Sequence, residues 1–174
     1  EDLFLPIHSD ESFRIKDILV DPMHTSHDAA DPVAYRMRYE NKKIAIATDL
    51  GTYNEYTVEC LKGMDAILIE ANHDEQLLLN GPYPTYLKER ILSPRGHQSN
   101  VTCGKLLAKN WHPAMRNVFL CHLSNENNDP NVAQDTIKDI LLEEGIMPGE
   151  DLFLTPLDRI KAGPVYTLND NIIR

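Results

Sequence analysis

The sequence predicts a mixed α/β domain built on a layered sheet. Two observations support this prediction: short apolar runs suited to strands dominate the first part of the chain, and segments with helical spacing lie between and after them. No break in composition and no internal repeat marks a second domain, and 174 residues suit one domain of ordinary size. A loose tail is expected over about residues 163–174, with one possible strand at 165–168.

The strands are predicted from alternation and from short apolar runs. Residues 33–40 alternate with a period of two, which is typical of a half-buried strand, and Asn41 and Lys42 suit the tip of a hairpin. Further strands are expected at residues 43–47, 66–69 and 118–121, with weaker signals at 15–20 and 152–154.

The clearest helix is predicted over residues 130–144. Asn128 or Asp129 suits its N-cap, Pro130 suits its first position and Gly145 suits its end. Three more helices are expected at residues 56–61, 86–92 and 100–108.

Charge and cysteine content exclude several classes of protein. Seventeen Lys and Arg against 27 Asp and Glu give a net charge of -10, which disfavours nucleic-acid binding through bulk charge but leaves a local basic groove open. Cys60, Cys103 and Cys121 lack CxxC spacing, so a disulfide framework or a thiolate zinc site is not expected, and reduced thiols in a cytoplasm are. No apolar run approaches the ~20 residues that a membrane span needs, and no signal-peptide pattern opens the chain.

Residues that bind metals or transfer protons follow several of the apolar runs. Asp49, Glu70 and His122 each come at the end of a predicted strand, and His27 lies a few residues beyond another. In open α/β sheets, sites form beyond the carboxyl ends of strands, so these four side chains are expected to converge on one edge. Two imidazoles and a carboxylate are ligands that zinc, manganese or iron accept.

Each of these residues also has a plain structural interpretation. A single His after a strand is more often a turn residue than a ligand, and Asp49 before Leu50 and Gly51 suits an ordinary turn. Glu70 could equally pair with a surface Lys. Spacing alone therefore leaves metal binding as one of two interpretations.

Six motifs occur in an order that resembles the metallo-β-lactamase-fold hydrolases, on the YycJ (WalJ)-like branch. Any one motif is weak, but the ordered set is specific and covers roughly residues 13–160. The motifs are residues 26–32, 47–51, 70–74 (Glu-Ala-Asn-His-Asp), 80–84 (Asn-Gly-Pro-Tyr-Pro), 96–100 (Gly-His-Gln-Ser-Asn) and 121–128.

The resemblance implies an αββα sandwich with a two-metal centre at one edge of its sheets. It implies that His27, Asp49 and His122 are metal ligands, with Asp49 bridging both ions, and that His97 and His73 are candidates for phosphate contact or for protonation of the leaving group. The implied cofactors are two divalent ions, zinc or manganese with iron as an alternative, which activate water for hydrolysis. The implied substrate is a phosphodiester, in DNA or RNA.

The family also carries a His-x-His-x-Asp-His signature in its first half, and this motif is absent from the sequence. The chain is therefore expected to be the C-terminal half of the fold, which agrees with a first residue, Glu1, that is not Met. Such a half would expose one face of its sheet, for docking with the N-terminal half of the same fold or for self-association.

Three functions remain open at this point. The chain could be part of a metal-dependent hydrolase that is active only with its other half, or a binding module that has lost catalysis. In the third, His27, Asp49 and His122 form a mononuclear site with open positions.

Overall fold

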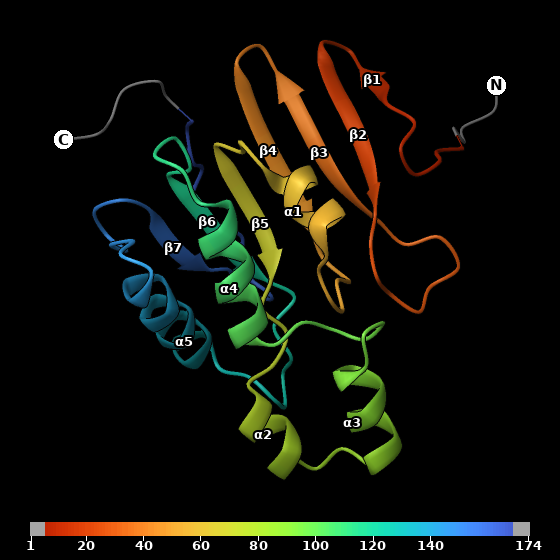
Figure 1. Cartoon of the computed structure of the whole chain (residues 1–174), viewed down its shortest axis with the longest axis vertical. Coiled ribbons are helices and arrows are strands. Elements are labelled where there is room, and N and C mark those ends of the chain that lie inside the picture. The colour runs from red at the N-terminus through yellow and green to blue at the C-terminus, as the bar shows by residue number, and fades with distance from the viewer. Residues whose placement is uncertain (1–5, 169–174) are drawn as a thin grey trace.

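The structure is a computed structural model that describes residues 6–168, and its centre is one seven-stranded sheet (Figure 1). The strands lie side by side in chain order. Neighbours from β1 to β4 run antiparallel, and neighbours from β4 to β7 run parallel. The strands are β1 (Phe13–Ile15), β2 (Ile18–His24), β3 (Val33–Tyr39), β4 (Lys42–Ala47), β5 (Ala66–Glu70), β6 (Asn117–Cys121) and β7 (Phe153–Pro156).

Five helices accompany the sheet in the described part of the chain. Figure 1 shows α1 (Glu55–Leu61), α4 (Asn100–Asn110) and α5 (Pro130–Glu143) on one side of the sheet, whereas α2 (Glu75–Asn80) and α3 (Thr85–Leu92) lie beyond the end of β5. Polar side chains start most of them: Asn54, Asp74, Ser99 and Asp129 each accept a hydrogen bond from the first turn of the helix that follows. Within residues 6–168, none of the helices is long and apolar enough to cross a membrane.

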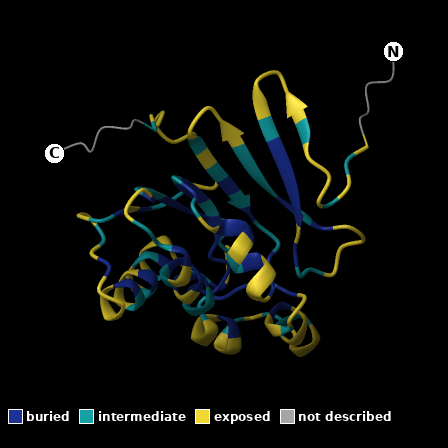
Figure 2. Cartoon of the chain, turned by 45° about the horizontal axis from the view of Figure 1, so that its top comes forward, coloured by how far each residue is buried: buried dark blue, intermediate teal, exposed yellow. Residues whose placement is uncertain are grey.

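The core lies between the sheet and the layer formed by α1, α4 and α5. Alternate strand residues point to the same face, and one row that faces this layer runs from Ala45 through Ile67 and Val118 to Leu154. The helices meet this row with fully buried side chains such as Leu106 of α4. Figure 2 shows buried residues concentrated along this contact.

The neighbouring row of side chains points to the opposite face of the sheet. Ile46, Leu68 and Phe119 are register neighbours in this row, and Ile46 and Leu68 are partly exposed. Tyr166 packs on Phe119 with ring centroids 4.6 Å apart. The sheet therefore has one apolar face in the core and a second apolar face that is only partly covered by the described residues.

The predicted class and most predicted elements are confirmed. The strands β3 to β6 and the helices α1, α3, α4 and α5 lie where the sequence placed them, within one or two residues, and Asp129 is the N-cap of α5. The weaker strand signal at 152–154 corresponds to β7, which starts one residue later. Helix α2 was not anticipated, because six residues are too few for a helical pattern.

Two strand predictions need correction: the one at residues 15–20 is right only in part, since residues 18–20 lie in β2, and the one at residues 165–168 is wrong. Residues 15–20 contain a tight turn instead of a continuous strand, since Lys16 has a φ of 52° and the chain reverses between β1 and β2. Residues 165–168 contain no strand, and they pair with none of the seven. The rest of the predicted tail, residues 169–174, lies outside the described residues, so the tail boundary stays a prediction.

Candidate metal centre

Four residues that can bind a metal meet beyond the carboxyl ends of three parallel strands. Asp49 follows β4, Glu70 ends β5, His122 follows β6, and His97 comes from the loop between α3 and α4. One ligand atom from each of these residues lies within 4.8 Å of the others. The parallel order of β4, β5 and β6 explains the cluster, because it brings the residues after each strand to the same edge.

His27 borders this group from the loop after β2. Its Nδ1 lies 2.9 Å from the carbonyl oxygen of Gly96, so Nδ1 is the donor of that hydrogen bond. Its Nε2 lies 3.8 Å from Oδ1 of Asp49. Because Nδ1 carries the proton of the neutral ring, Nε2 is unprotonated and has a lone pair. This is the usual state of an imidazole that binds a metal.

The carboxylate of Asp49 lies at the centre of the histidines. Its Oδ1 is 3.7 to 3.8 Å from a ring nitrogen of each of His27, His97 and His122, which is too long for a hydrogen bond. About half of the Asp49 side chain is exposed, at 47%. Imidazole nitrogens spaced around a carboxylate that forms no short bond to them fit the ligand set of a divalent transition metal.

The backbone is strained at two of these residues. Asp49 has a φ of 52° and His122 a φ of 54°, in the left-handed region that residues other than glycine rarely adopt. Hydrogen bonds hold both places: the Leu50 amide donates to Glu70 at 3.0 Å, and Asn72 donates to the carbonyl oxygen of His122 at the same distance. Such strain tends to collect at functional sites, because the surrounding structure must maintain it.

Glu70 is the only fully buried carboxylate in the four-residue group. Its Oε1 accepts from Nδ1 of His97 at 2.7 Å, and its Oε2 lies 3.4 Å from Nδ1 of His122. Burial raises the pKa of Glu70, but the hydrogen bonds from His122 and His97 outweigh burial, so the pKa lies below its usual range. The interaction with Glu70 in turn raises the pKa of His122, although burial of His122 acts to lower it. Glu70 is therefore an ionised brace that orients two histidines, and its position also allows it to bind a metal.

His73 lies near the centre but outside the group. Its side chain is 1% exposed, and neither ring nitrogen forms a hydrogen bond with another described residue. Burial lowers the pKa of His73 to about 4, so the ring is neutral at neutral pH. Its backbone pairs with Ser99 in an isolated bridge, which ties the end of β5 to the start of α4.

Close backbone packing fixes the loops that carry these side chains. A Cβ on Gly51 would collide with the carbonyl oxygen of Pro94, and one on Gly96 would collide with the carbonyl oxygens of Arg90 and Ile91. The amide of Gly51 also donates to the carbonyl oxygen of Ser26 at 2.8 Å. Only glycine allows the loops bearing Asp49, His97 and His27 to approach this closely.

An ion pair joins the His27 loop to α3. Two guanidinium nitrogens of Arg90 contact the two carboxylate oxygens of Asp28, at 2.5 and 2.9 Å. The hydrogen bonds from Arg90 lower the pKa of Asp28 to about 2. This bidentate pair holds the residue next to His27 against α3.

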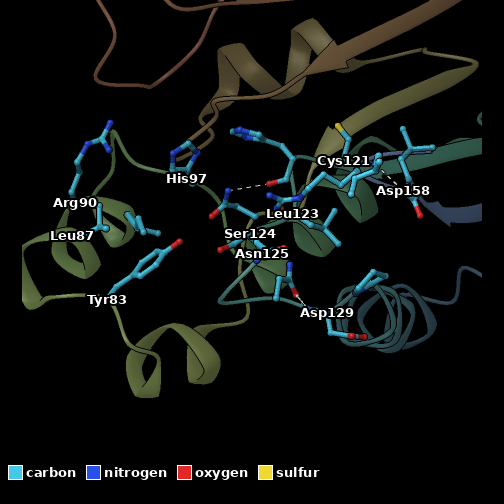
Figure 3. A pocket seen from close by; sticks show the side chains of 18 residues that line it. Tyr83, Leu87, Arg90, His97, Cys121, Leu123, Ser124, Asn125, Asp129 and Asp158 are labelled. Carbon is cyan, nitrogen blue, oxygen red and sulfur yellow. Dashed lines mark hydrogen bonds between the residues drawn. The ribbon is translucent and has the colours of Figure 1, made fainter. Parts of the chain in front are cut away.

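The centre opens into a groove with a volume near 1060 Å³ (Figure 3). His97 and His122 belong both to the centre and to the lining of the groove. One wall carries Tyr83, Leu87 and Arg90, and the other is formed by residues 123–125, 128–130 and 157–160. A ligand in this groove would therefore lie directly against two of the four residues of the centre.

Every site residue proposed from the sequence can now be located. His27, Asp49, His97 and His122 gather at one place, and His73 lies buried beside them; the roles assigned to these five residues stay predictions. Sequence reasoning did not single out Asn72, Gly96 or the Arg90–Asp28 pair. Gly96 and Asn72 both lie inside the six sequence motifs. Only the fold reveals that Gly96 holds His27 and that Asn72 holds His122.

Comparison with known proteins finds sequence relatives that are named exodeoxyribonucleases. No protein-family profile matches it. It is 36% identical over 134 residues to the exodeoxyribonuclease YycJ of Bacillus anthracis, which covers 77% of this chain and 51% of that protein. It is 34% identical over 135 residues to the exodeoxyribonuclease WalJ of Streptococcus pneumoniae, with 78% of this chain and 50% of that protein covered. The chain thus spans about half the length of the curated relatives it matches.

Solved structures agree on the fold. The metallo-β-lactamase fold protein YhfI of Bacillus subtilis matches 87% of this chain and 51% of its own with a TM-score of 0.62, at 12% identity. The Zn²⁺-bound PqqB of Methylobacterium extorquens matches 87% of this chain and 53% of its own with a TM-score of 0.54, at 15% identity. These proteins share the fold with this chain, and at such identities they show nothing more. The chain therefore belongs to the metallo-β-lactamase fold proteins, as a homologue of the YycJ/WalJ exodeoxyribonucleases that matches half of their length.

Proposed function

We propose that this chain is part of a metal-dependent nuclease that hydrolyses phosphodiester bonds in DNA. The observation that carries the proposal is the cluster of Asp49, Glu70, His97 and His122, whose ligand atoms lie within 4.8 Å of one another beside a large groove. Relatives named exodeoxyribonucleases support the choice of substrate.

Three residues are the best candidates to hold the metals. His27, Asp49 and His122 offer two imidazoles and a half-exposed carboxylate, a set that suits zinc or manganese. Bound divalent ions would supply Lewis-acid activation of water and charge neutralisation at the phosphate. The protein's part is to fix the ligands, and the braces from Gly96 to His27 and from Asn72 to His122 do so.

His97 suits the transfer of a proton to the leaving oxygen. Its Nδ1 donates to ionised Glu70, and this carboxylate would stabilise a protonated imidazole. Because His97 also lines the groove, its ring lies where a substrate would be. His73 is less suited to this step, since a ring with a pKa of about 4 is a neutral imidazole at neutral pH and therefore a poor proton donor, and a contact that orients the neighbouring loop suits it better.

The proposal includes a second polypeptide or segment. The chain matches half the length of its relatives, and the residues it supplies are too few for two complete coordination spheres. We propose that the other half of the fold, which carries the His-x-His-x-Asp-His motif, packs on the partly covered face formed by Ile46, Leu68 and Phe119. Self-association through the same face is the alternative.

The test combines metal content with hydrolysis. Elemental analysis and turnover of a generic phosphodiester and of DNA, with manganese or zinc, are measured for the chain alone and after adding a polypeptide that carries the missing motif. We expect little turnover from the chain alone, activity and two bound metals in the mixture, and loss of both with Asp49→Asn. Asp17→Asn, in the β1–β2 turn, is the matched control.

Three results would overturn the proposal. Robust metal-dependent turnover by the chain alone, abolished by Asp49→Asn, would mean that the site is complete without a partner. A mixture that binds metal but cleaves no phosphodiester would favour the binding module. One metal per chain in both samples would favour the mononuclear site.

A further inference from the structure

We propose that the groove beside the metal centre binds one nucleic-acid strand, with the ring of Tyr83 stacking on a base and the guanidinium of Arg159 contacting a backbone phosphate. This inference rests on the proposed function, because it names the residues through which the same site takes its substrate. Both residues line the groove that also contains His97 and His122.

The size of the groove suits a short stretch of one strand. Its volume near 1060 Å³ is slightly above the ~300–1,000 Å³ found for sites that enclose drug-sized ligands. A duplex is bound mainly by many cationic contacts to phosphates across a wide surface, which a net charge of -10 disfavours. A single strand instead needs a narrow groove, a few local cations and aromatic rings for its bases.

Tyr83 has the features of a stacking residue. It lies between Pro82 and Pro84, whose rings restrict the backbone and so reduce the entropy lost on binding. No described residue forms a hydrogen bond with its hydroxyl group, and its side chain is only half-buried. In Figure 3 the ring of Tyr83 extends into the space between Leu87 on its own wall and Asn125 on the opposite wall.

The spacing between the two walls is set by the protein itself. A Cβ on Gly81 would collide with Oδ1 of Asn127 and with the carbonyl oxygen of Leu77, so the turn before Tyr83 touches the opposite loop. The amide of Asp74 also donates to the carbonyl oxygen of Asn127 at 3.0 Å. The groove is therefore preorganised, and a base entering it meets Tyr83 at a fixed distance from the opposite wall.

The charges along the groove favour an anion near Arg159. Arg90 is paired with Asp28, whereas Asp129 and Asp158 each accept backbone hydrogen bonds at the start of a turn or helix. Arg159 donates to the carbonyl oxygen of Leu123 at 2.6 Å, and no described carboxylate forms an ion pair with it. Its remaining N–H groups can bind a phosphate, for which a guanidinium is well suited.

The experiment measures strand binding without metal. A short oligothymidylate labelled at one end is titrated with the 174-residue chain in EDTA, and fluorescence anisotropy gives the dissociation constant. We expect Tyr83→Ala and Tyr83→Leu to weaken binding on the order of tenfold, and Tyr83→Phe to bind within about twofold of the unchanged chain, because stacking needs only the ring. Tyr86→Ala is the matched control, since Tyr86 is 72% exposed on α3 and lies outside the groove.

The role of Arg159 is tested by measuring how the binding constant depends on salt concentration. Arg159→Ala should weaken binding and lower the slope of log K against log salt by about one, which is the loss of one phosphate contact. Arg14→Ala, on β1 and away from the groove, should leave the slope unchanged. Amide NMR shifts caused by the oligonucleotide should fall on the lining residues.

Four outcomes would overturn the inference: no binding in EDTA, equal binding by Tyr83→Ala or Tyr83→Leu, NMR shifts confined to other surfaces, or tighter binding of a duplex of the same length. Because the titration contains no metal and no reaction, it can fail while metal binding and hydrolysis by the complemented protein succeed. Such a result would contradict the assignment of the groove but not the proposed function.

Discussion

Asp49 and Glu70 are carboxylates at the ends of neighbouring strands, yet their surroundings give them different tasks. Asp49 is half exposed and forms no short hydrogen bond to the three imidazoles around it. Glu70 is fully buried and accepts hydrogen bonds from the Leu50 amide and from His97. A cation would therefore gain more from Asp49, and the fold would lose more from a change at Glu70.

This contrast gives a prediction for two isosteric variants. In the complete protein, Asp49→Asn should lower metal affinity more than Glu70→Gln does, since it removes a charge that two cations would share. Glu70→Gln should instead cost about 2 kcal/mol or more of unfolding free energy, because it disturbs a buried, hydrogen-bonded charge. Metal titration by calorimetry and urea unfolding measure the two effects. Equal losses of affinity, or a greater loss for Glu70→Gln, would reverse the ranking.

His73 gives a prediction about acid stability. An unfolded imidazole titrates near 6.5, whereas burial lowers the pKa of His73 to about 4 in the folded chain. Between these values the unfolded chain binds a proton that the folded chain does not. The contribution of His73 to stability is therefore complete above about pH 6.5 and is lost as the pH falls towards 4, by an amount on the order of 3 kcal/mol.

The measurement is urea unfolding at a series of pH values. His73→Gln should lose less unfolding free energy between pH 7 and 4 than the unchanged chain, whatever its stability at pH 7. His8→Gln, at an exposed position, is the matched control. Parallel curves for the unchanged chain and His73→Gln would show that the buried ring titrates normally.

Residue patterns grouped the candidate site residues only where those residues follow neighbouring strands. Asp49, Glu70 and His122 could be grouped from the sequence, because each follows an apolar strand and parallel strands end at one edge. The contact of His97 with Glu70 could not be derived in this way, since it joins residues 27 positions apart, and the path of α2, α3 and their loops between them is set by tertiary packing. The buried state of His73 was equally invisible, because polar neighbours surround it in the sequence.

At the scale of elements, local signals were reliable where they were redundant. Helix α5 has an Asp cap, a Pro at its start and regular apolar spacing, and all three agree with its position. The strand expected over residues 15–20 was predicted as continuous because the turn at Lys16 and Asp17 contains neither glycine nor proline to mark it. The position of that turn is determined by the pairing of β1 with β2. This pairing depends on contacts beyond the local sequence.

The loops between elements hold the site through glycine contacts, which gives a prediction at this scale. Gly51→Ala places a methyl group against the Pro94 carbonyl oxygen and the Gly96 amide, and these are backbone atoms that cannot move aside alone. We expect a loss of about 2 kcal/mol or more in unfolding free energy and a weaker affinity for metal, because the Asp49 and His97 loops must separate.

Gly163→Ala is the control, since a Cβ there would meet no atom within 4 Å. It should change neither stability nor metal binding. Thermal unfolding and metal titration of the two variants make the comparison. A Gly51→Ala chain as stable as Gly163→Ala would mean that the loops are not in the close contact described.

At the scale of the whole molecule, the two faces of the sheet differ in what covers them. The row from Ala45 to Leu154 is buried under three helices, whereas Ile46 and Leu68 in the next row are partly exposed. Apolar side chains gathered on one open face usually mark a surface for another polypeptide. The match to half the length of the relatives is consistent with this reading.

The last prediction concerns that face. Fully burying one Ile or Leu side chain contributes about 1.5–3 kcal/mol, and placing an ammonium group there adds a desolvation cost. Ile46→Lys or Leu68→Lys should therefore weaken association with a polypeptide carrying the missing motif by at least about tenfold. Leu142→Lys, on the outer side of α5 and 38% exposed, should associate like the unchanged chain. Sedimentation velocity separates the free chain from the complex, and circular dichroism confirms that each variant is folded. If both face variants associate normally while folded, the partner binds elsewhere; if the unchanged chain forms only dimers that Leu68→Lys dissociates, the face is used for self-association.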